Sequence, residues 1–317
     1  MTAYRALAPA KVNLGLFLGP VREGDGRHEL VSVMQSISLA DEVILEPGAH
    51  GAVRDELICP GVPGPAKENL AALALAAFRA RTGWDAAPLR LRITKRIPVA
   101  AGLGGGSADA AAALRLAMRA SGLGDRGLLW ELAGELGADV PAQISPGRWL
   151  AAGAGERLQE LPPPSASLGL LVLPLATELS TAEVYAEADR LGLAREPGEL
   201  RRRLLAMQAA LAQEEPLPAD ERLLENDLQP AALSLCPQIS AGLREARLAG
   251  AATALVSGSG PTVLGLFAGA GGPGLAERAA AGLRERVPPA LAARPVGAAF
   301  ARVVRHNPAG TAKRRNA

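Results

Sequence analysis

The sequence predicts an α+β protein of two lobes. The chain has 317 residues, about twice the length of a typical single domain. Apolar or alternating segments typical of strands recur between segments with helical periodicity in both halves. Between the halves, LPPPSAS at residues 161–167 holds three consecutive prolines, which disfavour both helices and central strands. We therefore expect one domain over residues 1–162 and a second over residues 163–317.

The first elements are predicted to be two strands, a helix and a third strand. Residues 5–18 form an apolar strand pattern with a proline-containing break, and residues 30–46 continue as strand after a turn-rich loop. Residues 68–82 are predicted to be helical, with Gly83 just beyond the end. LRLRIT, at residues 89–94, alternates as a half-buried strand does.

The rest of the first half is predicted to hold two helices and a hairpin. Residues 107–120 are rich in alanine, residues 125–136 show helical periodicity, and residues 147–161 resemble a short hairpin. These elements complete an α/β arrangement before the proline-rich segment.

In the second half, strands and helices alternate again. The expected strands are residues 168–175, 263–267 and 295–305, and the expected helices are residues 181–193, 198–215, 240–250 and 276–287. A glycine turn, VSGSGPT, precedes the strand at residue 263.

Composition narrows the class of protein. Hydrophobic residues make up 49% and charged residues 21%, as in a soluble globular protein, and the net charge of +2 does not indicate a nucleic-acid partner. Two cysteines without CxxC spacing and three scattered histidines indicate neither a disulfide framework nor a zinc site. With no apolar leader or long apolar run, we expect a cytoplasmic protein without membrane contact, a monomer or weak homodimer.

The most distinctive segment is PVAAGLGGGSADAAAAL, from Pro98 to Leu114. A strand, a glycine-rich turn and a helix in this order can bind an anion through free backbone N–H groups at the helix N-terminus. The segment lacks the lysine of GxxxxGK[ST] and only approximates a dinucleotide-binding fingerprint. A glycine-rich surface turn without a ligand is the alternative interpretation.

Together with two other motifs, this segment resembles the phosphate loop of the GHMP small-molecule kinases. APAKVNL at residues 8–14 is similar to the first motif of that family, and SGSGPT at residues 257–262 to the third. The resemblance implies the two-lobed GHMP kinase fold, with an N-terminal ATP-binding β/α domain and a C-terminal ferredoxin-like α/β sandwich. The catalytic cleft is then expected between the lobes, with ATP and Mg²⁺ as cofactors.

Further segments are similar to the branch of this family whose acceptor is 4-diphosphocytidyl-2-C-methyl-D-erythritol. They are the DGRH turn ending at His28, LGADVP at residues 136–141, STAEVY at residues 180–185, and Asn226-Asp227. The resemblance implies phosphorylation of the 2-hydroxyl of that acceptor in the non-mevalonate isoprenoid precursor pathway. The alternatives are another GHMP kinase, acting on homoserine, mevalonate or a sugar, and a non-catalytic binding module that retains the fold.

The resemblance also implies the catalytic residues. Asp139, in LGADVP, takes the position of the catalytic base, although local sequence alone favours a helix cap or turn. Lys11 is its expected partner, and it is one of only four lysines beside thirty arginines. Asn13 lies two residues on, on the same strand face, and is expected to bind erythritol hydroxyls.

Nucleotide-binding residues are expected in and around the glycine loop. The triphosphate is assigned to the loop, and Asn69 and Lys95 are assigned to the adenine end, where a helix cap and a solvated lysine are the alternatives. Ser107 is a candidate contact for Mg²⁺, whose other ligands the sequence does not identify. The loop residues are Pro98, Gly102, Leu103, Gly104, Gly105, Gly106 and Ser107.

Cytosine recognition is assigned to side chains from two distant segments. His28 is expected to bind the base edge, Tyr185 to stack on the ring, and Thr181 to contact the erythritol unit. The family usually has an aromatic residue just before the histidine, but this chain has Arg27. A guanidinium plane can also stack on a base, so we expect Arg27 to replace the ring.

Overall fold

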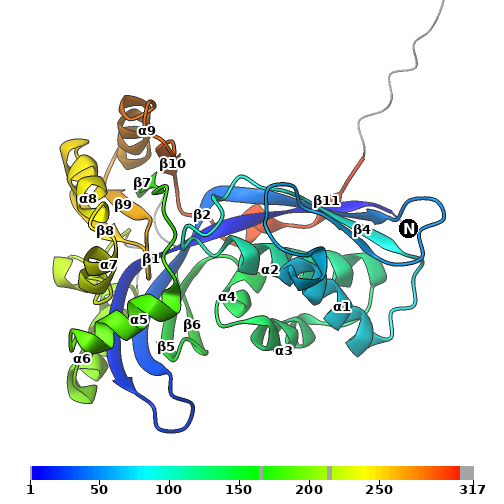
Figure 1. The fold of residues 1–317 in the computed structure, drawn as a ribbon, viewed down its shortest axis with the longest axis horizontal. Coiled ribbons are helices and arrows are strands. Elements are labelled where there is room, and N and C mark those ends of the chain that lie inside the picture. The colour runs from blue at the N-terminus through cyan, green and yellow to red at the C-terminus, as the bar shows by residue number, and fades with distance from the viewer. Residues whose placement is uncertain (1, 164–166, 213–215, 308–317) are drawn as a thin grey trace, which may run out of the picture.

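A long antiparallel hairpin is the central element of the molecule. The computed structural model describes residues 2–163, 167–212 and 216–307. Strand β1 (Tyr4–Val21) pairs with β2 (His28–Pro47), and the two strands run through both lobes (Figure 1). Irregularities in the register lie between Pro9 and Lys11 and between Asn13 and Gly15, so the predicted site residues Lys11 and Asn13 each lie next to an interruption in the pairing.

The larger sheet is built around this hairpin. Its order is β11-β1-β2-β4-β3, with β5 beside β2 and β6 beside β5. The pairs are antiparallel except β3 with β4, which is parallel. The added strands are β3 (Glu56–Ile58), β4 (Leu89–Thr94), β5 (Arg148–Gly153), β6 (Arg157–Leu161) and β11 (Val304–Arg305).

Helices α1 to α4 cover one face of this sheet and with it form the first lobe. Helix α2 is rich in alanine, and its buried alanines allow close packing against α1 and β1. Asn69 caps the start of α1, and Gly83 ends it at a φ of 66°. The helices are α1 (Leu70–Thr82), α2 (Gly105–Ser121), α3 (Arg126–Leu136) and α4 (Val140–Ile144), and a 3₁₀ turn spans Ala66–Glu68.

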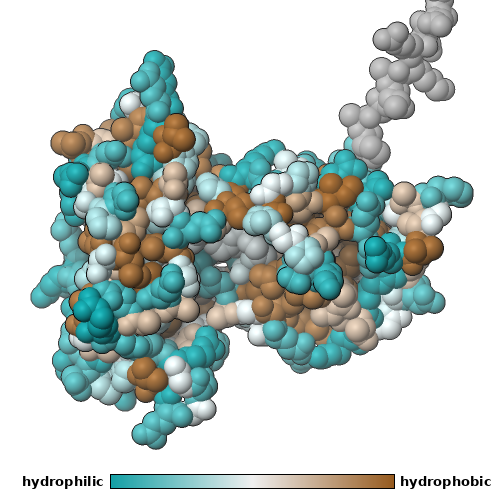
Figure 2. Space-filling model, in the orientation of Figure 1, coloured by the Kyte–Doolittle hydropathy of each residue, from teal (hydrophilic) through white to brown (hydrophobic). Residues whose placement is uncertain are grey.

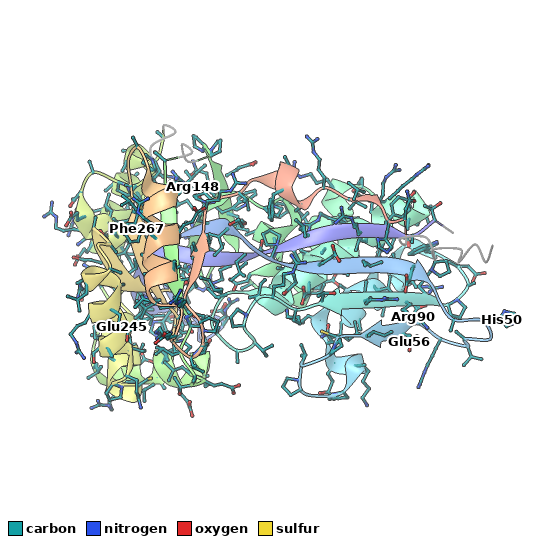
Figure 3. The ribbon with its side chains drawn as sticks, turned by 90° about the horizontal axis from the view of Figure 1, so that it is seen from above. His50, Glu56, Arg90, Arg148, Glu245 and Phe267 are labelled. Atoms are coloured by element: carbon teal, nitrogen blue, oxygen red, sulfur yellow. The ribbon has the colours of Figure 1, made fainter. Side chains whose placement is uncertain are left out.

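The second lobe contains an antiparallel sheet of order β10-β7-β9-β8 and the helices around it. Figure 3 places Glu245 and Phe267 in this lobe, opposite Glu56 and Arg90 at the far end of the larger sheet. Its strands are β7 (Gly169–Leu173), β8 (Thr253–Val256), β9 (Val263–Phe267) and β10 (Leu291–Ala293). Its helices are α5 (Thr181–Arg190), α6 (Pro197–Ala210), α7 (Gln229–Leu235), α8 (Ile239–Leu248) and α9 (Gly272–Gly282), with a 3₁₀ turn over Glu221–Leu224.

The two-lobed α+β prediction is confirmed, and the differences are local: β3, α4 and β10 were not predicted, and the helix expected at residues 276–287 spans Gly272–Gly282. The segment at 295–305, expected to be one strand, contains a 3₁₀ turn (Ala298–Ala301) and the two-residue strand β11. Strand β1 continues through Pro9 instead of breaking. The register of its pairing with β2 shifts directly after Pro9, and such an irregularity is where a strand tolerates proline. Helix α7 and strand β8 are short and lack the periodicity that would have indicated them.

The predicted division at residue 162 stays a prediction. Residues 164–166, within the proline-rich segment, lie outside the described residues. Contacts cross this division: β11 pairs with β1, and α6 packs against both β1 and β2.

Within the described parts of the chain, no helix has the length and apolar character needed to cross a bilayer.

Candidate active site

The three motifs identified in the sequence meet at one place. The backbone N–H of Lys11 donates to Leu103 O at 2.9 Å, which joins the first motif to the glycine loop. The Thr262 hydroxyl donates to Ala101 O at 2.7 Å, which joins the third motif to the same loop. The Asn13 N–H donates to Ser257 Oγ at 3.2 Å, which joins the first motif to the third. Segments about 90 and 250 residues away from the first motif in the sequence therefore form one site.

The glycines of the loop are required by these contacts as well as by the loop conformation. Gly102 has a φ of +72°, and a Cβ atom on it would lie 2.4 Å from Gly260 O. Gly104 has a φ of +66°, and a Cβ atom there would lie 2.8 Å from Lys11 Cγ. Both positions combine a left-handed backbone with close approach of another motif, so only glycine fits.

Helix α2 begins at Gly105, directly after this loop. Its first intrahelical hydrogen bond runs from Ala108 N to Gly104 O at 2.9 Å, so the N–H groups of the preceding turn have no helical acceptor. The 17-residue helix places the positive end of its dipole at the cavity wall formed by Gly102, Gly104 and Ser107. This geometry suits a phosphate group.

Lys11 and Asp139 form an ion pair on the cavity wall. The distance from Lys11 Nζ to Asp139 Oδ2 is 3.2 Å, and the same ammonium donates to Asn13 Oδ1 at 3.0 Å. Asp139 precedes α4, and its side chain makes no hydrogen bond to cap that helix. At 39% exposure, the carboxylate remains open to a ligand. The helix-cap alternative therefore does not account for this aspartate.

Asn13 is itself fixed by hydrogen bonds. Its Nδ2 donates to Ser32 Oγ at 2.7 Å, and the Ser32 hydroxyl donates to Gly15 O at 2.8 Å. These bonds orient the amide so that its oxygen faces the Lys11 ammonium.

Lys95 lies in a buried ionic cluster. Its ammonium contacts Asp41 and Asp109, and the Asp109 Oδ2 distance is 2.8 Å. Burial raises the pKa of Asp109 to about 7, against the lowering effect of Lys95. A Cβ atom on Gly105 would lie 3.3 Å from Lys95 Nζ, which places the cluster beneath the first turn of α2. The alternative of a solvated lysine is therefore wrong.

Several predicted nucleotide-binding residues lie outside the cavity lining. Asn69 accepts a hydrogen bond from Ala71 N at 2.9 Å as the cap of α1. Leu103 is buried and Pro98 is half-buried. Among the described residues, the cavity lining includes neither these three nor Lys95, Gly105 and Gly106.

The opposite side of the cavity carries the predicted cytosine-binding side chains. The cavity has a volume of about 800 Å³, and Figure 2 shows the surface hollowed between the lobes. His28 is buried, its Nδ1 lies 2.8 Å from Gly19 O, and its ring centroid is 5.5 Å from that of Tyr185. Burial raises the pKa of the Tyr185 hydroxyl. Arg27 donates to Ala154 O at 2.8 Å and also lines the cavity.

Helix α5 brings in the remaining predicted residue. Thr181, at the helix start, has its hydroxyl 3.0 Å from Ser259 Oγ of the third motif. Asp189, on the same helix, places a carboxylate oxygen 3.0 Å from His28 Nε2 without hydrogen-bond geometry. The sequence analysis assigned no role to Ser259, although it lies within the third motif, or to Asp189, which lies close to the STAEVY motif.

Asn226 has a structural role that the sequence did not reveal. Its Nδ2 donates to Val256 O at 2.8 Å and to Gly258 O at 2.7 Å, which fixes the turn of the third motif. The Asn-Asp pair was the available signal, but its partners are about 30 residues away.

Among the described residues, no group of three or more His, Cys, Asp or Glu side chains could hold a metal ion. The phosphate side of the cavity offers the Ser107 hydroxyl, with Asp139 also in the lining. These few oxygens fit a Mg²⁺ ion that is bound mainly by nucleotide phosphates and water.

Comparison with known proteins agrees with this geometry. Residues 69–147 match the model of the GHMP kinases N-terminal domain, and residues 206–288 match that of the GHMP kinases C-terminal domain. The chain is 44% identical over 273 residues to a 4-diphosphocytidyl-2-C-methyl-D-erythritol kinase of Anaeromyxobacter dehalogenans, covering 84% of this chain and 81% of that protein. The corresponding enzyme of Streptomyces coelicolor is 44% identical over 263 residues, covering 80% and 84% of the two chains.

Solved structures give the same result. A crystal structure of 4-(cytidine 5'-diphospho)-2C-methyl-D-erythritol kinase superposes with a TM-score of 0.70 at 35% identity, covering 92% of this chain and 99% of that chain. A homoserine kinase from Cytophaga hutchinsonii has a TM-score of 0.64 at 18% identity, covering 96% and 98%, and shows a likeness of fold alone.

Proposed function

This chain belongs to the GHMP kinase family, and from that premise we propose that it transfers the γ-phosphoryl group of ATP to the 2-hydroxyl of 4-diphosphocytidyl-2-C-methyl-D-erythritol. The protein is thus an ATP-dependent small-molecule kinase of the non-mevalonate isoprenoid precursor pathway. The observation that carries the proposal is the Lys11–Asp139 pair, 3.2 Å apart, between a helix N-terminus suited to phosphate and a wall lined by His28 and Tyr185.

Asp139 is proposed to accept the proton of the acceptor hydroxyl as its oxygen attacks the γ-phosphorus and the bond to the β-phosphate oxygen breaks. Lys11 stabilises the negative charge of the carboxylate and of the developing alkoxide. The ammonium is held in place by Asn13, so it is oriented before the substrate binds. The rest of the catalytic effect comes from positioning and charge neutralisation, as is general for phosphoryl transfer.

The glycine loop and the α2 N-terminus are proposed to bind the triphosphate through backbone N–H groups. Mg²⁺ would be held by phosphate oxygens with Ser107 as a protein contact, and it would neutralise charge on the transferring group. Asn69 and Lys95 are proposed to support the adenine end from behind the cavity wall, through the α1 cap and the buried ionic cluster.

Acceptor recognition is proposed to depend on the turn between β1 and β2 and on α5. His28 binds the cytosine edge, Tyr185 and Arg27 stack on the base from the two sides, and Thr181 contacts the erythritol unit. The 5.5 Å separation of the His28 and Tyr185 rings and their shared cavity support this arrangement.

The test is ADP release by the purified protein with ATP and Mg²⁺. The acceptors, assayed side by side, are 4-diphosphocytidyl-2-C-methyl-D-erythritol, free methylerythritol, homoserine and mevalonate. We expect turnover only with the cytidylated acceptor. Turnover with another acceptor alone would overturn the substrate assignment, and no turnover with any of them would leave a binding module that retains the kinase fold.

A further inference from the structure

The helix that follows the proposed catalytic base is too short to hold itself in place. Helix α4 has five residues, Val140–Ile144, and an isolated helix of that length is unstable in water. The Asp139 side chain does not cap it. The position of the carboxylate relative to Lys11 must therefore be set by contacts between α4 and its neighbours.

One such contact is made by Gln143, whose side chain is buried at 1% exposure. Its Nε2 donates to Pro9 O on β1 at 3.2 Å, and its Oε1 accepts from the Ser36 hydroxyl on β2 at 3.5 Å. Pro9 lies two residues before Lys11, and Ser36 is the residue paired with Lys11 across the hairpin. Gln143 thus links α4 to the piece of sheet that carries the Lys11 ammonium.

The second contact is made by Arg115, which extends from α2. Its Nη1 donates to Gln143 O at 2.5 Å and more distantly to Ile144 O at 3.5 Å, at the C-terminal end of α4. Its Nη2 donates to Leu7 O on β1 at 3.1 Å. The guanidinium therefore joins three elements: the phosphate-binding helix, the strand of Lys11 and the helix after Asp139.

The stability of the fold does not by itself account for the buried Arg115 guanidinium. In the described part of the chain, the hydrogen-bond partners of Arg115 are carbonyl oxygens, and its buried Nε has no partner. Burial lowers the pKa of the guanidinium to about 10. A cation held in the protein without a carboxylate disfavours folding, whereas an apolar side chain of similar length would avoid this penalty.

We propose that Arg115 and Gln143 are positioning residues for phosphoryl transfer, which hold Asp139 at the correct distance from Lys11 and from the phosphate-binding helix. The proposal rests on the proposed function, because it assigns the two residues to the same reaction. Neither residue lines the cavity among the described residues, so both act through α4 and not on the substrates.

The test compares Arg115→Met with Arg119→Met, which makes the same change one turn further along α2. Arg119 is exposed and contacts only the ring of Tyr4, 5.5 Å from its guanidinium, among the described contacts. With ATP, Mg²⁺ and the cytidylated acceptor, Arg115→Met is expected to lower kcat by about 10- to 100-fold, since a displacement of about 1 Å can cost 10²-fold. The KM values for both substrates should stay within about threefold, and Arg119→Met should match the wild type. Arg115→Lys should recover part of kcat.

Gln143→Met provides a second variant in case Arg115→Met does not fold. It keeps the side-chain volume close and removes both links to the hairpin, so the same fall in kcat with nearly unchanged KM is expected. A kcat within about threefold of wild type in the folded variants overturns the positioning role. A fall in kcat accompanied by a comparable rise in KM also overturns it. A wild type that does not phosphorylate the cytidylated acceptor overturns the proposed function together with the positioning role, whereas the other failures leave the proposed function intact.

Discussion

The two walls of the cavity are built in different ways. The phosphate wall consists of backbone and of side chains held by hydrogen bonds: the glycine loop, the start of α2, and the Lys11 ammonium, which donates to Asn13. The acceptor wall consists of side chains from the turn between β1 and β2 and from helix α5, including Arg27, His28 and Tyr185. The glycine loop of the phosphate wall also contains the buried core residues Ala101 and Leu103, so changes there are expected to affect rate and folding together. The acceptor wall is expected to tolerate exchange of one side chain for another, with effects on binding.

The largest expected effect lies between the two walls, at the proposed base. Asp139→Asn keeps the shape but cannot accept the proton, so kcat should fall by about 10²- to 10⁴-fold with little change in KM for ATP. Steady-state kinetics measure this, and Asp125→Asn, at the cap of α3 and away from the cavity, is the control. A kcat within tenfold of wild type would mean that another group accepts the proton.

A smaller effect is expected from the phosphate wall. Gly102→Ala would force a Cβ atom to within 2.4 Å of Gly260 O at a φ of +72°, so the loop and the third motif must separate. We expect kcat/KM to fall by about 10- to 100-fold, because misplacement by about 1 Å can cost 10²-fold, and the melting temperature to fall as well.

The control for this change isolates the close contact from backbone strain. Gly122 ends α2 at a φ of +71°, but nothing lies within 4 Å of a Cβ atom built there. Gly122→Ala should therefore lower stability through strain by about 1–2 kcal/mol and leave kcat/KM unchanged. Equal loss of activity in both variants would show that the phosphate wall does not depend on contact between the motifs.

On the acceptor wall, His28→Ala should weaken recognition of the base without slowing chemistry. Loss of one hydrogen-bonding group to a base is worth about 1–3 kcal/mol, which corresponds to a KM for the cytidylated acceptor about 5- to 150-fold higher. The KM for ATP should not change. His50→Ala, exposed at the far end of the larger sheet (Figure 3), is the matched control. A fall in kcat with unchanged acceptor KM would contradict the assignment.

The smallest effect is expected at Arg27. Changing this residue to an aromatic one restores the type of side chain that is usual in the family. Arg27→Tyr exchanges one planar stacking group for another, each worth about 1–3 kcal/mol, so the acceptor KM should stay within about tenfold. Complete loss of acceptor binding would show that the guanidinium has another task. Arg27→Ala, assayed in parallel, measures what either plane contributes.

The sequence predicted most of this architecture because its strongest signals are local. Alternation in LRLRIT, the alanine-rich run after the glycine loop and the Asn69 and Gly83 boundaries each depend on neighbouring residues, and the structure has the corresponding elements. The family could be predicted because each of its motifs is a contiguous stretch of sequence. The assignment is confirmed by the two matching family models and by the relatives. Short elements such as β8 gave too little periodicity to be predicted.

The individual site roles stay predictions, but the structure changes how some of them are understood. Lys95, predicted to serve the adenine end, lies between Asp41 and Asp109, which are 54 and 14 residues away from it. Asn69 is a helix cap, as its alternative interpretation stated, and it remains a proposed support for the nucleotide. No local pattern announces partners at such separations.

By itself, the sequence determined the fold class, the family and the backbone conformation of the phosphate loop, since these depend on periodicity, glycine placement and contiguous motifs. Only the tertiary structure decided which groups face one another: Lys11 with Asp139, Gly102 with Gly260, and Arg115 with the end of α4. Each of these contacts joins segments that approach only when the helices pack onto the long hairpin. Burial of the apolar face of α2 and the irregular pairing of β1 fix those distances, and neither is encoded in any single stretch of chain.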